Sequence, residues 1–71
     1  MSKMATVHIG NSVRAQREKR FMTQEEFARF VGLSRDHLGR IERNEHEPRF
    51  RTIKQIADKL GLEPSELVDE G

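Results

Sequence analysis

Apolar residues along this chain recur every three or four positions, and no stretch alternates regularly between apolar and polar residues. The first spacing places apolar side chains on one face of a helix, whereas alternation would indicate a half-buried strand. The clearest stripe is formed by Phe50, Ile53, Ile56, Ala57 and Leu60. The pattern therefore predicts an all-α protein.

The same spacing predicts five helices joined by short connections. The first is expected from about Ile9 or Asn11 to Arg20. The others are expected over about 24–31, 35–43, 50–60 and 64–69. Residues 1–8 show no helical period, so we expect a flexible N-terminal segment there, followed by one domain over residues 9–71.

The middle of the chain has the strongest signals for helix ends. Thr23 with Glu26 three residues later is typical of a capping box. Gly32 ends the second helix where a left-handed residue is favoured, and Ser34 is placed to cap the third. Two short helices are therefore predicted to meet at a tight turn.

Charged residues fall on both faces of the third predicted helix. At 100° per residue, one direction is shared by Ser34, Leu38, Ile41, Glu42 and Glu45. The opposite direction is shared by Asp36, Arg40 and Arg43. The first direction should face the core, with Glu42 as an exception that needs a partner. In the first helix, Arg17 shares an inward face with Val13 and needs a partner too.

The formal net charge of +1 hides an uneven distribution. All 13 Lys and Arg residues lie in 1–62, together with eight acidic residues, whereas 63–71 hold four acidic residues and no basic one. A basic body suits an anionic partner such as nucleic acid. A chain that is 35% charged can equally have a solvated surface, so charge alone does not decide.

Several classes of site are disfavoured by composition. Without cysteine, neither a disulfide nor a Cys-based zinc site can form. The histidines, His8, His37 and His46, have no second type of ligand at a metal-binding spacing, so we expect no metal and no cofactor. No apolar run approaches the ~20 residues of a membrane span, and no signal peptide follows Met1. We expect a soluble, cytoplasmic protein.

The chain resembles the lambda-repressor-like helix-turn-helix proteins of the Cro/C1, or XRE, type over about residues 9–68. The resemblance is carried by Thr23-Gln24, Phe27-Ala28, Gly32-Leu33-Ser34, Leu38, Ile41-Glu42-Arg43-Asn44, Pro48, Ile53, Ile56-Ala57, Leu60-Gly61-Leu62 and Glu66-Leu67. It implies a five-helix DNA-binding domain in which the second and third helices form the helix-turn-helix. It also implies a prokaryotic or phage protein associated with the nucleoid.

The resemblance further implies a sequence-specific transcriptional regulator, a repressor, that binds double-stranded DNA. Such proteins usually bind a palindromic operator as a homodimer, with the third helix (about 35–43) in the major groove. The residues expected to read bases are Arg35, Asp36 and Arg40. The residues expected to contact phosphates are Gln24, Ser34, His37, Arg43 and Asn44.

The family often pairs an arginine of its first helix with a glutamate near the end of its third, which here implies an Arg17–Glu42 ion pair. The chain departs from the family at two phenylalanines. Phe21 stands where glycine usually ends the first helix and cannot easily take a positive φ, so either the helix ends differently or Phe21 packs against something. Phe30 replaces a polar residue, and it either folds back on the body or forms a contact surface with Phe21.

Apolar residues that could form a dimer interface are Leu62, Leu67, Val68 and Phe30. An alternative function is an antitoxin-type or other protein-interaction module with secondary DNA binding, which would contact its partner through the acidic C-terminal tail. A tail that does not pack on the body would favour that alternative. An enzyme is rejected, because the chain has no nucleophile–base pair, no Gly-rich phosphate loop and no room for a pocket.

Overall fold

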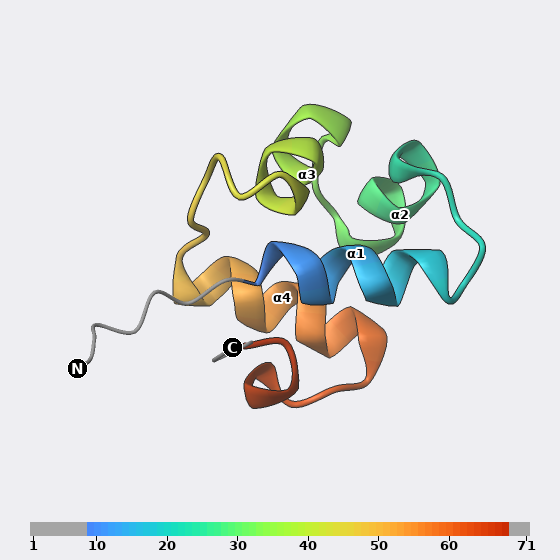
Figure 1. Ribbon diagram of the computed structural model, residues 1–71. Coiled ribbons are helices and arrows are strands. Elements are labelled where there is room, and N and C mark those ends of the chain that lie inside the picture. Colours follow the sequence, from blue (N-terminus) through green and yellow to red (C-terminus); the bar gives the residue numbers. More distant parts are fainter. Residues whose placement is uncertain (1–8, 69–71) are drawn as a thin grey trace.

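The computed structural model describes residues 9–68, and these residues are helical without any strand. The elements are α1 (Gly10–Glu18), α2 (Gln24–Val31), α3 (Arg35–Glu42), α4 (Phe50–Leu60) and a 3-10 turn, η1 (Pro64–Glu66). The proposed N-terminal segment, 1–8, lies outside the described residues. Figure 1 shows α2 and α3 together on one side of the molecule and η1 on the other, with α4 between them.

The prediction of a fifth α-helix was wrong. Over 64–69 the described residues form only the single turn Pro64–Glu66, closed by a bond from the Leu67 backbone N–H to the Pro64 carbonyl of 3.0 Å. Glu66 reaches back to cap the turn, with its carboxylate 2.9 Å from the Glu63 backbone nitrogen. The chain leaves the turn at Leu67, whose side chain is fully buried. The described end of the chain is therefore held on the body by the buried Leu67 side chain and not by a fifth helix.

One core unites all of these elements. Its fully buried side chains include Val13 from α1, Phe27 from α2, Leu38 from α3, Ile56 from α4 and Leu67 after η1. Burying a side chain of this size contributes roughly 1.5–3 kcal/mol. In the described part of the chain, no helix has the length and apolar character needed to cross a membrane.

The predicted caps of the helix-turn-helix are confirmed. Thr23 and Glu26 form a reciprocal capping box, with N–O distances of 3.1 and 2.9 Å. The Ser34 hydroxyl accepts a bond of 3.0 Å from the backbone N–H of His37. Gly32 has a φ of 81°. These local bonds fix the ends of α2 and α3, and thereby the turn between them.

All four helices end in the same way, with a left-handed residue followed by a bond back over the last turn. The left-handed residues are Phe21, Gly32, Asn44 and Gly61. In each case the following residue donates its N–H to a carbonyl five positions earlier, at 2.8–3.3 Å. This is the Schellman motif, and it satisfies carbonyls that the helix leaves free.

Both expectations for Phe21 were wrong. The residue adopts a φ of 55°, and its side chain is 94% exposed. The turn between α1 and α2 is closed by bonds from Phe21 N–H to the Glu18 carbonyl and from Met22 N–H to the Arg17 carbonyl. Because this closure requires a left-handed residue, the fold holds Phe21 there without a packing contact in return. These bonds also end α1 at Glu18 and not at Arg20.

Candidate nucleic-acid interface

Helix α3 has one buried face and one exposed face. Leu38 and Ile41 are buried in the core, whereas Arg35, Asp36 and Arg40 are exposed. The three residues predicted to read bases therefore lie on the solvent side of a helix whose other side is fixed by packing. Such a surface is geometrically able to enter a groove of DNA.

A polar hollow of about 250 Å³ lies between the start of α2 and the exposed face of α3. It is lined by Gln24, Arg35, Asp36, Gly39 and Arg43. A Cβ at Gly39 would lie 3.0 Å from Arg43 Nη1, so a larger residue there would shift the end of this flexible side chain. The hollow brings together two predicted base-reading residues and two predicted phosphate contacts.

Two arginines of this surface are paired with carboxylates of the same chain. Arg40 Nε lies 3.2 Å from Asp36 Oδ2, one helical turn earlier. Arg43 makes a two-pronged contact with Glu45, with Nε–Oε2 at 2.9 Å and Nη2–Oε1 at 3.2 Å. The hydrogen bonds between this second pair lower the pKa of the Glu45 carboxyl and raise the pKa of Arg43.

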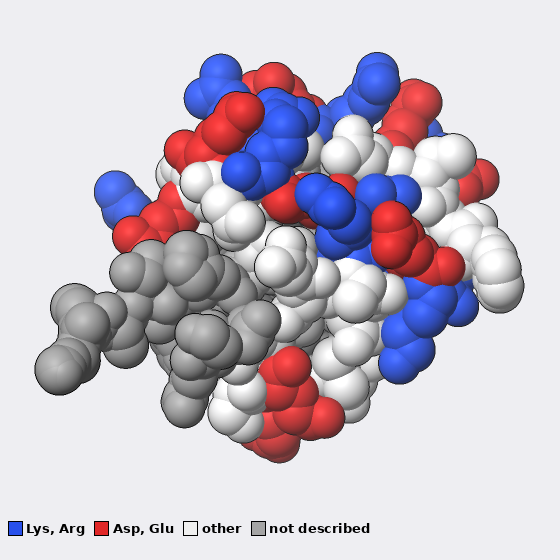
Figure 2. Space-filling view, in the orientation of Figure 1, with Lys and Arg blue, Asp and Glu red and all other residues white. Residues whose placement is uncertain are grey.

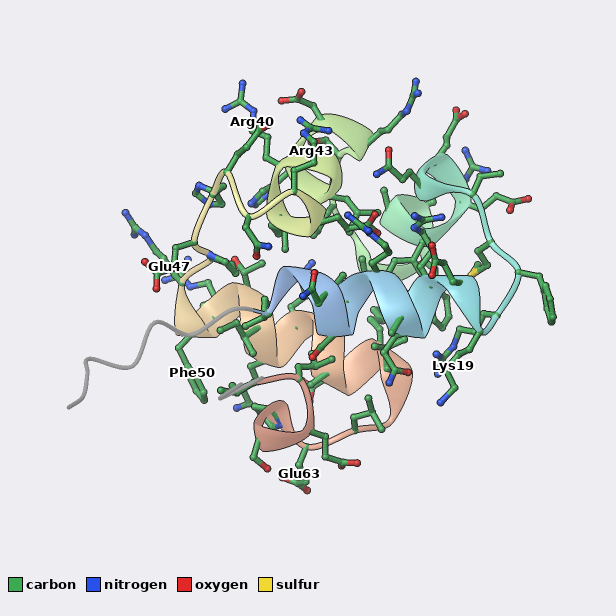
Figure 3. All side chains as sticks on the ribbon, viewed as in Figure 1. Lys19, Arg40, Arg43, Glu47, Phe50 and Glu63 are labelled. Carbon is green, nitrogen blue, oxygen red and sulfur yellow. The ribbon has the colours of Figure 1, made fainter. Side chains whose placement is uncertain are left out.

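The arrangement of charges over α2 and α3 is therefore mixed. Figure 2 shows basic and acidic side chains interleaved at this end of the molecule, without a continuous basic patch. Figure 3 shows Arg40 and Arg43 projecting outward at the end of α3. Arg40 and Arg43 already have counter-ions in the chain itself, whereas Arg35 has none among the described residues.

A buried network supports the interface from behind. Glu42 is only 1% exposed, and it accepts bonds from Arg17 Nε at 2.8 Å and Arg17 Nη2 at 3.0 Å. These hydrogen bonds are the main reason that the pKa of Arg17 is raised. Arg17 also donates to the Met22 carbonyl at 3.1 Å. The network ties α1, the α1–α2 connection and α3 together.

Gln24 belongs to this network as well as to the interface. Its side-chain amide donates a bond of 3.0 Å to Glu42 Oε1. Sequence reasoning assigned Gln24 to phosphate contact and missed this bond, because the partner lies eighteen residues away on another helix. In the structure, Gln24 connects the polar hollow to the buried carboxylate.

The remaining predicted phosphate contacts differ in accessibility. Ser34 and Asn44 are exposed, whereas His37 is half-buried with its ring centroid 5.0 Å from that of His46. The Nε2 atom of His37 is buried and has no hydrogen-bond partner among the described residues. His46 was not predicted to take part in this surface, and its position depends on the fold of the α3–α4 loop.

Glu45 was assigned by periodicity to the inward face of α3, and this assignment was wrong. The helix ends at Glu42, and the left-handed Asn44 turns the chain so that Glu45 is exposed beside Arg43. Asn44 is a type of residue that adopts a left-handed conformation readily. The periodicity did not predict the direction that the chain takes after Asn44.

The predicted dimer residues are not equally available. Leu67 is fully buried in the core of the single chain, so its assignment to an interface was wrong. Leu62 and Val68 are half-buried. Phe30 is 42% exposed and rests against Phe27, with ring centroids 6.3 Å apart. The Phe30 side chain is therefore only partly folded back on the body of the protein.

The model of the helix-turn-helix family HTH_3 matches residues 13–67. No curated protein matches the chain significantly.

Solved structures of regulators share this fold. The chain is 32% identical to an HTH_3 family transcriptional regulator from Vibrio cholerae, with a TM-score of 0.77 over 84% of the chain and 34% of the regulator. It thus spans about a third of that protein. It is also 32% identical to the restriction-modification controller protein C.AhdI from Aeromonas hydrophila, with a TM-score of 0.75 over 83% and 86% of the two chains.

A DNA complex is among the similar structures. The P22 c2 repressor protein, solved with synthetic operator 9T, is 27% identical, with a TM-score of 0.77 over 93% of this chain and all of the repressor. The match of the family model over most of the described residues is decisive, because it includes α2, the turn and α3. The chain belongs to the helix-turn-helix family HTH_3, a family of DNA-binding transcriptional regulators.

Proposed function

We propose that the chain is a sequence-specific regulator of transcription, acting as a repressor, that places α3 in the major groove of double-stranded DNA. One observation carries this proposal. Arg35, Asp36 and Arg40 are exposed on the side of α3 opposite its buried residues. Arg35 and Asp36 also line the hollow next to Gln24, at the start of α2. This is the side-chain chemistry that distinguishes base edges in the major groove.

The roles of the residues follow from their chemistry. Arg35 and Arg40 each have a guanidinium that can donate two bonds to guanine O6 and N7, and Asp36 can accept from cytosine N4. Arg43, Ser34 and Asn44 are exposed at the two ends of α3 and would contact phosphates. The likeness to a repressor solved on its operator supports this arrangement.

We further propose that the chain binds a palindromic operator as a homodimer, since one such helix reads only a few base pairs. The C-terminal end is the proposed interface. Val68 there lines a mainly apolar hollow of about 260 Å³, whose other lining residues are Ile9, Glu47, Pro48, Phe50 and Ile53. Phe50 is largely exposed in the single chain. Replacing Phe50 by Ser should shift a sedimenting dimer to monomer, and a wild-type monomer both free and on DNA would contradict the dimer.

Selection of binding sites from random DNA tests the function directly. The purified protein should enrich a palindromic sequence with half-sites about one helical turn apart. Binding to the enriched site should weaken steeply with salt. No enrichment, together with a nearly flat salt dependence, would contradict sequence-specific DNA binding.

The alternative of a protein-interaction module loses one of its supports. It is favoured by an acidic tail that does not pack on the body, but η1 packs on α4 and Leu67 is buried. The described part of the tail is thus held by the core. Co-purification with a basic protein that competes with DNA would revive this alternative.

A further inference from the structure

The contact between Arg43 and Glu45 is unusual for residues only two positions apart. On a helix, side chains at positions i and i+2 do not face each other. Here Asn44 lies between them with a φ of 59°, and this left-handed residue reverses the direction of the chain. The reversal brings the Glu45 carboxylate against the Arg43 guanidinium.

The backbone holds Glu45 in this place. Its N–H donates a bond of 2.8 Å to the Arg40 carbonyl, and the Asn44 N–H donates one of 3.0 Å to the Ile41 carbonyl. These bonds close the end of α3 and do not involve the carboxylate of Glu45. The helix end therefore fixes the backbone of Glu45 beside Arg43, where its carboxylate can reach the guanidinium.

The contact uses the groups that DNA would use. Arg43 donates from Nε and Nη2, at 2.9 and 3.2 Å, to the two oxygens of one carboxylate. A DNA phosphate presents two oxygens to a guanidinium in the same two-pronged geometry. Arg43 also lines the polar hollow at the DNA-facing surface, and both side chains are about half exposed. A phosphate at this position has to compete with Glu45.

We propose that Glu45 is a built-in counter-ion that masks Arg43 and thereby lowers the affinity of the protein for DNA of any sequence. This inference rests on the proposed function. In the free protein, the Arg43–Glu45 pair has no net charge, so it neutralises little of the DNA charge until Glu45 is displaced. Glu45 acts through Arg43 and is a positioning residue, which touches no base.

The test is a comparison of Glu45→Gln with Glu47→Gln. Both variants remove one negative charge from the α3–α4 loop, but Glu47 makes no ion pair among the described residues. Glu47 also lines the hollow at the proposed dimer interface, so the two variants are compared only after sedimentation gives them the oligomeric state of the wild type. Figure 3 shows Glu47 on that loop, beyond Arg40 and Arg43. Glu47→Gln therefore reports the general effect of charge, and any further gain in Glu45→Gln reports the release of Arg43.

Binding is measured on random DNA and on the selected site over a series of salt concentrations. Relative to Glu47→Gln, Glu45→Gln should bind both DNAs more tightly, by up to about fivefold, which is the upper end of what an exposed ion pair contributes. Its plot of log affinity against log salt should be steeper by up to about one, because one more cation faces the phosphates. In the Arg43→Gln background, Glu45→Gln should bring no gain over Glu47→Gln.

Equal gains in DNA affinity for the two glutamine variants would overturn the inference, because loss of one negative charge anywhere in the loop would then explain the gain. A gain of Glu45→Gln that persists without Arg43 would overturn it too. In either case the wild type still binds its site, so the proposed function stands. A wild type that binds no DNA contradicts the proposed function itself, and the inference with it. Circular dichroism melting confirms that each variant is folded.

Discussion

At the scale of single residues, Phe21 has the clearest backbone cost in the described part of the chain. A left-handed conformation costs a residue with a Cβ roughly 1–2 kcal/mol, and Phe21 gains no burial in exchange. Asn44, the other described non-glycine residue with a positive φ, is of a type that tolerates it. Phe21 is therefore a position at which the sequence and the local structure disagree.

The first prediction concerns this position. Phe21→Gly should raise the free energy of unfolding by about 0.5–1 kcal/mol, because relief of the left-handed strain exceeds the greater flexibility of glycine in the unfolded chain. Phe21→Ala is the control, since it removes the exposed ring and keeps the strain. Chemical denaturation of the three proteins measures the effect. An equal gain with alanine would assign the cost to the ring and not to the backbone.

At the scale of elements, α1 and α3 are joined by a buried charge and by a close approach of their backbones. Arg17 is 16% exposed on its side chain and neutralises Glu42, which is 1% exposed. At the other end of α1, a Cβ on Gly10 would lie 2.4 Å from the Ile41 carbonyl and 2.5 Å from Asn44 Oδ1. The orientation of α3 therefore depends on contacts at both ends of α1.

The second prediction is that Glu42→Ala lowers the free energy of unfolding by about 3 kcal/mol, because it leaves the Arg17 charge without its partner. The apolar double variant Arg17→Met/Glu42→Leu should recover most of this loss, since no unpaired charge remains. Thermal melting, monitored by circular dichroism, compares the stability of the single and the double variant. A single variant that melts with the wild type would mean that the pair adds nothing.

The third prediction is that Gly10→Ala lowers the free energy of unfolding by about 1–3 kcal/mol, the usual cost of inserting a methyl group where there is no space. Asn11→Ala is the matched control on the next, exposed residue of α1, where a change within about 0.5 kcal/mol is expected. Denaturant titration measures both. Equal stability of the two variants would show that α1 shifts freely away from α3.

At the scale of the whole molecule, the surface formed by α2 and α3 over the core has mixed charge. The basic body expected from the sequence does not produce a uniform basic face, because Asp36 and Glu45 lie beside Arg40 and Arg43. In the proposed function, a DNA phosphate that binds Arg43 has to displace the carboxylate of Glu45. The contributions of Arg40 and Arg43 to the affinity for DNA can be measured by replacing each arginine in turn.

The fourth prediction separates the two kinds of contact. Arg40→Ala should cost about 1–3 kcal/mol on the selected site and relax its sequence preference, as expected for a residue that reads a base. Arg43→Ala should weaken binding to all sequences alike and make the salt dependence shallower by about one. Competition binding on selected and random DNA gives both quantities. The same loss on both DNAs for the two variants would contradict the assigned roles.

Much of the fold could be predicted from local signals. The stripe in 50–60, the capping box at Thr23 and the left-handed Gly32 correspond to α4 and to the two ends of α2. These features depend on interactions within one turn of helix, and the residues that make them are close together in the sequence. The inward faces of Arg17 and Glu42 were equally visible from periodicity, because a charge that falls on an apolar stripe stands out.

Patterns within the sequence therefore predict the class of fold, the extent of the middle helices, and the residues of α3 that face away from the core. Packing of the folded chain adds three features that these patterns do not contain: Leu67 fills the core in place of a fifth helix, Phe21 adopts a strained backbone without support, and Glu45 lies against Arg43. The difference lies in the range of the interactions. Caps and helical periodicity act between neighbours, whereas burial and the direction of the chain after a helix end depend on how all the elements pack together.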